Sequence, residues 1–208
     1  MTAYIYLGGE IRPEGIEETP GKGDLIIAAD SGYENAKMLG VNPTVALGDF
    51  DSYDENLIPS DVKKIPFPPK KDFTDSQLAV EYAIEQGCTR IYLIGGISGR
   101  LDHTLSNLAI LENLWERQIR CIITDGFNRV RFLRNDSEIL PRSPHFRYFG
   151  LLAADERIRG VEIDGCKYPL KNATLVRKNQ FAVSNEIVGN CAFISVRRGG
   201  IWIVESHG

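Results

Sequence analysis

Acidic side chains follow two of the short apolar runs in the first half of this sequence. Asp30 comes directly after Leu25–Ala29, and Asp49 and Asp51 come after Val45–Leu47. Short continuous apolar runs are typical of strands that are buried on both faces of a parallel sheet. Because the carboxyl ends of parallel strands share one edge of the sheet, these carboxylates are expected to meet in one cleft.

Three further carboxylates extend this pattern. Asp72 and Asp75 follow a proline-rich turn and open a predicted helix, and Asp102 follows the apolar run Ile91–Ile94 and a glycine-rich turn. Two carboxylates about 4 Å apart repel by roughly 4 kcal/mol at an effective dielectric near 20. A hard divalent cation such as Mg²⁺, which takes carboxylate and phosphate oxygens, would offset that repulsion. The set therefore predicts metal-assisted phosphoryl chemistry.

The glycine-rich turn is Gly95-Gly-Ile-Ser-Gly-Arg100, between a predicted strand and a predicted helix. Its glycines, Gly96 and Gly99 among them, would let backbone N–H groups approach a phosphate, and the Arg100 guanidinium would add a fork of donors. Its spacing is neither that of a Walker A loop nor that of a dinucleotide-binding fingerprint. Lys70 and Lys71 could also neutralise a phosphate, or form an ordinary solvated charge pair. His103 could serve as a general base or only cap its helix.

Strand and helix signals alternate over the first part of the chain, which predicts an α/β domain with a mainly parallel sheet. One helix is expected after Thr74, where Thr74 and Gln77 match a capping box. A second helix is expected to carry one apolar stripe, formed by Leu101, Leu105, Leu108, Leu111 and Trp115. Later runs are short and separated by turn residues, which favours an all-β sandwich or barrel-like domain. The predicted boundaries are residues 1–130 for the α/β catalytic domain that binds ATP and magnesium, and 131–208 for the β-rich domain.

The composition excludes some classes of partner. The formal net charge is −4, from 24 Lys and Arg against 28 Asp and Glu, so no basic surface for nucleic acid is expected. No apolar run approaches the roughly 20 residues that span a bilayer, so no membrane association is expected. The four cysteines form no Cys-x-x-Cys pair and are expected to be reduced and mostly buried, which indicates a cytoplasmic protein.

Ordered blocks of this sequence resemble the thiamine pyrophosphokinase family. They are Ala28-Ala-Asp-Ser-Gly32 with Gly40-Val-Asn-Pro43, Gly48-Asp-Phe-Asp-Ser52, Lys71-Asp-Phe-Thr-Asp75, Gly95-Gly-Ile-Ser-Gly-Arg-Leu-Asp-His103 with Asn107 after it, and the C-terminal pair Gly165-Cys-Lys-Tyr-Pro-Leu170 and Ser184-Asn-Glu186. The chain departs from the family pattern at Ser31 and Ser98, where glycine is common.

The resemblance implies an N-terminal α/β catalytic domain, a C-terminal β-rich thiamine-binding domain, and a homodimer with thiamine bound near the subunit interface. By this resemblance the Mg²⁺ ligands would be Asp49, Asp51 and Asp75, and these three with Arg100 and Asp102 would be the catalytic set. Asp30, Lys71, Asp72, Thr74, Gly96 and Gly99 would surround the nucleotide ATP. Asp75, Asp102, Ser184, Asn185 and Trp202 would contact thiamine.

The implied reaction transfers the pyrophosphate of ATP to the hydroxyl of thiamine, giving thiamine diphosphate and AMP, and Asp75 or Asp102 could take the hydroxyl proton. Two other functions compete with it. One is a related pterin pyrophosphokinase, which the Ser184-Asn-Glu186 block argues against. The other is a non-enzymatic sensor of nucleotide or thiamine, which would not need so many mutually repelling carboxylates. An Asp-x-Asp glycosyltransferase does not account for Asp75 or for the glycine-rich turn.

Overall fold

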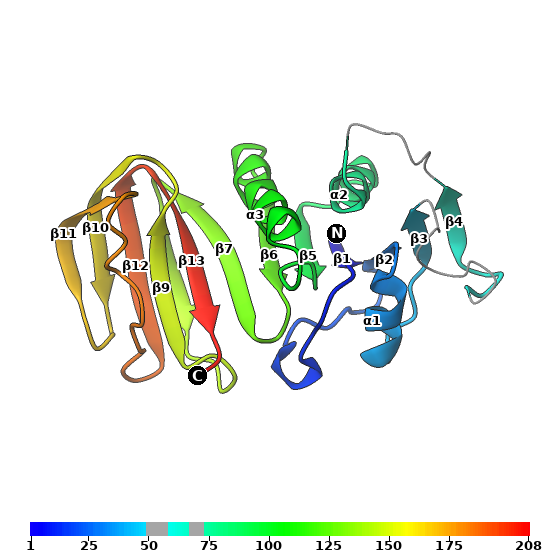
Figure 1. The fold of residues 1–208 in the computed structure, drawn as a ribbon, viewed down its shortest axis with the longest axis horizontal. Coiled ribbons are helices and arrows are strands. Elements are labelled where there is room, and N and C mark those ends of the chain that lie inside the picture. Colours follow the sequence, from blue (N-terminus) through cyan, green and yellow to red (C-terminus); the bar gives the residue numbers. More distant parts are fainter. Residues whose placement is uncertain (49–57, 67–72) are drawn as a thin grey trace. The chain divides into compact units, whose positions relative to one another are not determined.

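A computed structural model of the protein describes residues 1–48, 58–66 and 73–208. The chain forms two compact units, Met1–Gly126 and Phe127–Gly208, which are both drawn in Figure 1. Among the described residues, no helix is both long enough and apolar enough to cross a membrane.

The first unit is built on a parallel sheet. Its described strands are β1 (Thr2–Tyr6), β2 (Leu25–Ala29), β3 (Val45–Gly48), β4 (Lys63–Pro66), β5 (Arg90–Ile94) and β6 (Arg120–Thr124). They lie in the order β4-β3-β2-β1-β5-β6, and every neighbouring pair in that series is parallel. The helical segments are a 3-10 turn (Pro13–Gly15), α1 (Gly32–Met38), α2 (Asp75–Glu85) and α3 (Leu101–Glu116). The predicted α/β fold with a mainly parallel sheet is confirmed.

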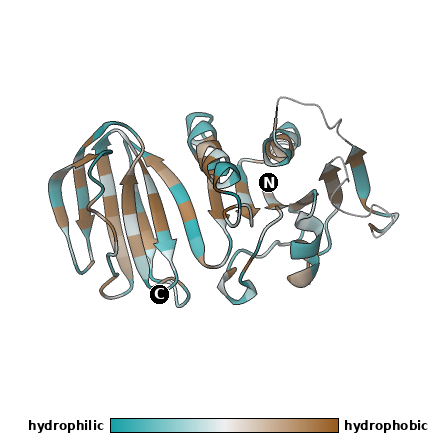
Figure 2. Ribbon diagram, in the orientation of Figure 1, coloured by the Kyte–Doolittle hydropathy of each residue, from teal (hydrophilic) through white to brown (hydrophobic). Residues whose placement is uncertain are grey.

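Both faces of this sheet are buried, as the continuous apolar runs predicted. Tyr4 and Tyr6 of β1 pack in one cluster with Ala36 of α1. Because side chains alternate along a strand, Ala3 and Ile5 point to the opposite face, and both are fully buried. Helix α2 contacts β1, β2 and β3, and Figure 2 shows hydrophobic residues concentrated in these central strands.

The strand order shows where the direction in which strands are added to the sheet reverses. The chain runs outward from β1 through β2 and β3 to β4, and then returns to place β5 on the other side of β1. In open α/β sheets, ligands bind at the carboxyl ends of the strands at such a reversal. The loops that follow β1 and β5 are therefore the first place to look for a site.

The apolar stripe predicted for α3 is only partly correct. Leu111 is buried, but Leu101 and Leu105 are 68% and 59% exposed. The buried positions of α3 also include Asn107, Ile110 and Leu114. Periodicity shows which residues share a face of a helix, but tertiary contacts decide whether that face is buried. In α3 only the later turns of the stripe are buried by other described residues.

The second unit, every residue of which is described, contains strands and no helix. The strands are β7 (Asn128–Arg134), β8 (Ser137–Pro141), β9 (Tyr148–Ala153), β10 (Arg157–Asp164), β11 (Leu170–Val176), β12 (Cys191–Arg198) and β13 (Gly200–Ser206). They form the antiparallel series β7-β13-β9 and β11-β10-β12-β8. The all-β prediction is confirmed. Strands β7, β8 and β9 and the first residues of β10 occupy the region 125–160, whose role the sequence left open.

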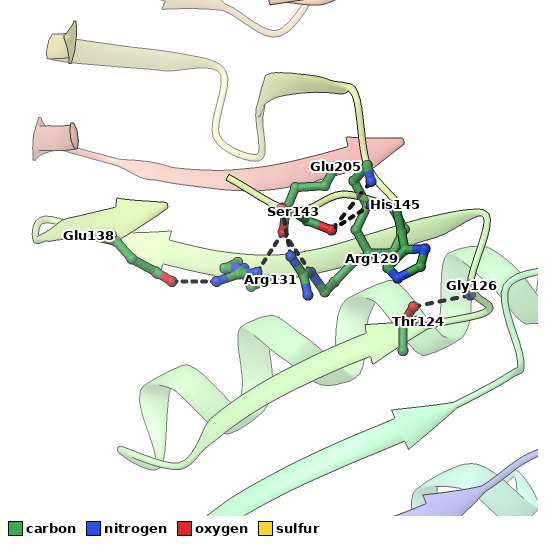
Figure 3. Close-up of polar contacts among 9 residues, drawn as sticks. Thr124, Gly126, Arg129, Arg131, Glu138, Ser143, His145 and Glu205 are labelled. Atoms are coloured by element: carbon green, nitrogen blue, oxygen red, sulfur yellow. Dashed lines mark hydrogen bonds and ion pairs between the residues drawn. The ribbon is translucent and has the colours of Figure 1, made fainter. Parts of the chain in front are cut away.

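A buried cluster of charges joins β7, β8 and β13 inside the second unit (Figure 3). The Glu205 carboxylate accepts from Arg129 Nε and Nη2 at 2.8 Å each and from Arg131 Nη2 at 2.6 Å. Arg131 also donates to Glu138 Oε1 at 2.8 Å. The Glu205 side chain is only 3% exposed. Since isolated buried charges are very unfavourable, the members of this cluster depend on one another.

The cysteine prediction is correct in one part and wrong in another. All four cysteines are free, and Cys88 and Cys121 are buried. Burial raises the pKa of the Cys121 thiol well above its usual range, so this group stays protonated. Cys166 is half-buried and Cys191 is exposed, however, because Cys191 begins β12 at a position whose side chain points to solvent.

Candidate active site

A cavity of about 430 Å³ lies in the first unit at the carboxyl ends of the central strands. Its wall combines the loop after β1, the loop after β2, the start of α2, and the glycine-rich turn and first turns of α3. The lining residues are Leu7, Gly8, Gly9, Ala29, Asp30, Ser31, Thr74, Asp75, Ser76, Gly96, Ser98, Gly99, Arg100, His103 and Asn107. The cavity therefore sits where the winding of the sheet reverses.

The cavity brings together seven of the residues for which the sequence predicted a binding or catalytic role, which are Asp30, Thr74, Asp75, Gly96, Gly99, Arg100 and His103. The predicted residues Asp49, Asp51, Lys70, Lys71 and Asp72 lie outside the described residues. Within the described ranges, no group of three or more His, Cys, Asp or Glu side chains is arranged to hold a metal ion. The predicted roles of all these residues remain predictions.

Asp30 is held in an unusual backbone conformation at the end of β2. Its φ angle is 49°, in the left-handed region that few residues other than glycine adopt. Its N–H donates to Leu47 O of the neighbouring strand at 2.8 Å, which extends the sheet by one residue. The left-handed turn then leads straight into α1. Backbone geometry of this kind is often found at functional sites.

Asp75 is fixed by the start of α2. The Thr74 hydroxyl accepts from Gln77 N at 3.3 Å, and Gln77 Oε1 accepts from Thr74 N at 2.8 Å. This is the reciprocal capping box that the sequence predicted, and it is confirmed. Asp75 is the first helical residue, where the helix dipole favours a negative charge. The cap thus holds a carboxylate at the cavity wall.

Replacing the cap tests this arrangement. Thr74→Ala is expected to lower the free energy of unfolding by about 0.5–2 kcal/mol, the usual cost of losing an N-cap side chain. Thr74→Ser retains the hydroxyl and is the matched control. Urea unfolding of both variants measures the difference, and equal stability of Thr74→Ala and Thr74→Ser would contradict the role assigned to the hydroxyl.

The glycine-rich turn is pressed against the loop that follows β1. Gly95 and Gly96 have φ angles of 93° and 77°, and a Cβ on Gly95 would lie 2.6 Å from Leu7 O. Gly96 N donates to Gly8 O at 3.0 Å, and Asn107 Nδ2 donates to Gly96 O at 2.7 Å. Only glycine meets both the conformation and the space here.

The loop after β1 contributes to the cavity wall, although the sequence did not predict it. Asn35, which is buried, donates from Nδ2 to Leu7 O at 2.7 Å and to Gly9 O at 2.9 Å, and so fixes the loop from α1. The only signal for it in the sequence was the pair Gly8-Gly9, directly after the first apolar run. Such glycine pairs are also common in turns that bind no ligand.

Arg100 and Asp102 form an exposed ion pair at the start of α3. Arg100 Nη2 lies 2.6 Å from Asp102 Oδ2, and the side chains are 71% and 66% exposed. The hydrogen bond from Arg100 lowers the pKa of Asp102 and raises that of Arg100. Arg100 lines the cavity, but Asp102, which the sequence placed at a strand end, lies in the first turn of α3 and does not line it.

The predicted thiamine contacts Ser184 and Asn185 lie in the second unit. Ser184 is exposed and has a left-handed φ of 57°. The Asn185 side chain is buried, where Oδ1 accepts from Tyr168 N at 3.0 Å and Nδ2 donates to Tyr168 O at 2.9 Å. Nδ2 also donates to Cys166 Sγ at 3.3 Å. The Asn185 amide therefore ties the Cys166–Tyr168 segment to the Ser184 segment.

Trp202 lies on β13 and is half-buried. Its ring packs edge-on against Phe132, with the ring centroids 6.1 Å apart. Its Nε1 is buried and has no hydrogen-bond partner among the described residues.

Comparison with known proteins agrees with this geometry. The family model "Thiamin pyrophosphokinase, catalytic domain" matches residues 17–123, and the model "Thiamin pyrophosphokinase, vitamin B1 binding domain" matches residues 136–201. Thiamine pyrophosphokinase of Bacillus subtilis is 27% identical over 186 residues, which cover 88% of this chain and 87% of the relative.

Solved structures agree with these matches. The Bacillus subtilis thiamine pyrophosphokinase structure has a TM-score of 0.90 at 26% identity, with 100% of both chains covered. The Geobacillus thermodenitrificans thiamin pyrophosphokinase structure has a TM-score of 0.86 at 25% identity, covering 100% of this chain and 98% of the other. The fold, the cavity and the two family matches together show that this chain belongs to the thiamin pyrophosphokinase family.

Proposed function

We propose that this protein is a thiamine pyrophosphokinase, which transfers the pyrophosphate of ATP to the hydroxyl of thiamine and releases AMP. The observation that carries the proposal is the cavity lined by Asp30, Asp75, Arg100 and the glycine-rich turn, in a chain that matches both domains of the family. Carboxylates, an arginine and close-approaching backbone are what a site for a metal-bound polyphosphate requires.

In this proposal each part of the chain binds one of the two substrates. Residues 1–130 bind ATP and carry the reacting groups, and residues 131–208 bind thiamine. The match of residues 136–201 to a vitamin B1 binding domain supports the second assignment. Around the nucleotide we place Asp30, Thr74, Gly96 and Gly99 from the cavity wall, together with Lys71 and Asp72.

Magnesium is the metal we propose, with Asp49, Asp51 and Asp75 as ligands. The donor set fits it, because the Asp30 and Asp75 carboxylates both line the cavity and Mg²⁺ prefers carboxylate and phosphate oxygens. When bound, the ion would neutralise phosphate charge and orient the polyphosphate chain.

The protein's own groups account for the remaining steps. The thiamine hydroxyl oxygen attacks the β-phosphorus, the bond from that phosphorus to the oxygen bridging to the α-phosphorus breaks, and AMP leaves with that oxygen. Arg100 would donate to phosphate oxygens as charge develops. Asp102 is paired with Arg100 and does not line the cavity. We therefore assign the hydroxyl proton to Asp75, which lines the cavity, and give Asp102 the task of orienting Arg100.

For thiamine, Ser184 and Trp202 are the proposed direct contacts. The Asn185 amide is committed to Tyr168 and Cys166, so Asn185 would act by holding the Ser184 segment in place. The assembly we propose is a cytoplasmic homodimer, with thiamine near the subunit interface. The exposed Leu101 and Leu105 on α3 are apolar surface of the kind that such an interface covers.

An assay for AMP tests this function, using purified protein with ATP and Mg²⁺, with and without thiamine. AMP that forms only when thiamine is present is the expected result. Formation of AMP with hydroxymethyl-dihydropterin and not with thiamine would instead establish a pterin pyrophosphokinase. Binding of ATP and thiamine by folded protein without any AMP would establish a sensor and overturn the enzymatic proposal.

A further inference from the structure

The hydroxyl of Ser98 has no hydrogen-bond partner among the described residues. Its Oγ is buried, and no donor or acceptor in the described part of the chain reaches it. A buried hydroxyl without a partner is destabilising, and such groups in folded proteins call for an explanation. Ser98 stands in the glycine-rich turn and lines the 430 Å³ cavity.

Ser98 lies under the loop after β1. A Cβ on Gly9 would lie 2.6 Å from Ser98 Oγ, and a Cβ on Gly8 would clash with Ser31 Oγ. Gly9 has a φ angle of 98°, which other residues rarely adopt. The Ser31 side chain, from the loop after β2, therefore occupies the space that a side chain at position 8 would need. The Ser98 side chain, from the turn after β5, does the same at position 9.

The same loop presents further donors. Gly8 and Gly9 both line the cavity, and neither of their N–H groups donates a hydrogen bond within the described residues. Their carbonyl groups are engaged, since Gly8 O accepts from Gly96 N and Gly9 O accepts from Asn35 Nδ2. Gly8 and Gly9 are therefore held through their carbonyl groups, and their N–H groups are unused among the described residues.

Hydrogen-bond donors that lack acceptors at a cavity wall suit a ligand that only accepts hydrogen bonds. A phosphate group is such a ligand, and backbone N–H groups of a glycine turn commonly bind it together with a side-chain hydroxyl. The Asp30 and Asp75 carboxylates on the same wall repel an anion, so a phosphate there needs compensating donors. The Ser98 oxygen is covered in this structure, and rotation about its single χ1 bond to another staggered rotamer is the movement that would bring it to the cavity.

We propose that the Ser98 hydroxyl binds a phosphate oxygen of the nucleotide, together with the N–H groups of Gly8 and Gly9. The proposal rests on the function proposed above, because it names the part of ATP that this side of the site holds. It assigns Ser98 to ligand binding, at a cost to the stability of the ligand-free fold.

Calorimetric titration of the wild-type protein, Ser98→Ala and Ser98→Thr with three probes tests the proposal. The probes are ATP, inorganic tripolyphosphate and adenosine, each in the presence of Mg²⁺. Ser98→Ala is expected to weaken binding of ATP and of tripolyphosphate about tenfold, the scale of one hydrogen bond to a charged group. Binding of adenosine should not change, and Ser98→Thr, which retains the hydroxyl, should restore most of the affinity.

Thermal unfolding separates this role from a structural one. Ser98→Ala removes a buried group without a partner, so its melting temperature is expected to equal or exceed that of the wild type. A lower melting temperature with unchanged ATP affinity would overturn the proposal, as would equal loss of affinity for adenosine. If the wild type binds tripolyphosphate through Ser98 but forms no AMP with thiamine, the proposed function fails while the phosphate site stands.

Discussion

Asp75→Asn is expected to slow thiamine-dependent AMP formation by roughly 10²–10⁴-fold, the range for loss of a positioned general base. The carboxylate lies at the cavity wall as the first residue of α2. In the proposed mechanism it takes the proton of the attacking hydroxyl and is also a Mg²⁺ ligand. Asparagine has nearly the same shape and leaves the capping box of Thr74 and Gln77 intact. The fold should therefore persist, with a stability cost of only about 0.3–1 kcal/mol from the lost charge at the helix start.

Glu34→Gln is the matched control for that substitution. Glu34 is also an acidic residue in the first turn of a helix, but it is exposed and does not line the cavity. Its rate of AMP formation should match that of the wild type. If Asp75→Asn and Glu34→Gln have the same rate at saturating Mg²⁺, the assignment of Asp75 to the reaction is wrong.

Glu205→Gln is expected to lower the free energy of unfolding of the second unit by about 3–5 kcal/mol, the usual cost of breaking a buried ion pair from one side. Two guanidinium groups, of Arg129 and Arg131, share the Glu205 carboxylate. In Glu205→Gln the Arg129 and Arg131 guanidinium groups stay buried, but the negative charge that stabilises them there is lost. Urea unfolding followed by tryptophan fluorescence measures the effect, since Trp202 lies on the same strand.

Glu186→Gln provides the comparison for this effect. Glu186 also pairs with two cations, Arg147 and Lys167, each at 3.2 Å, but those side chains are 63% and 53% exposed. Water and salt screen such pairs, so the stability of Glu186→Gln should stay close to that of the wild type. Equal destabilisation by the two substitutions would show that burial does not decide the strength of these ion pairs.

Local signals predicted the parts of the site that are built locally. The capping box at Thr74 and Gln77 depends on residues three apart, and it was visible in the sequence. The meeting of Asp30, Gly96 and Arg100 at one cavity followed from the rule that parallel strands end at a common edge. The topology of a parallel sheet is enough to predict that these residues lie close together.

What the sequence did not reveal depends on contacts between distant segments. Gly8 and Gly9 matter because Ser31 and Ser98 reach the space beside them from other loops. The buried positions of Arg129, Arg131 and Glu205 could not be foreseen either, because charged residues that alternate with apolar ones along a strand ordinarily face solvent. Leu101 and Leu105 fit a core stripe by spacing, yet nothing in the described fold covers them.

Phosphorus NMR of the products tests the central claim most directly. Wild-type protein would be incubated with ATP, Mg²⁺ and thiamine until about half of the ATP is consumed. Thiamine diphosphate and AMP are expected in equal amounts, because the β- and γ-phosphoryl groups move together. Thiamine monophosphate with ADP would show transfer of a single phosphoryl group from the γ-position and would contradict that claim.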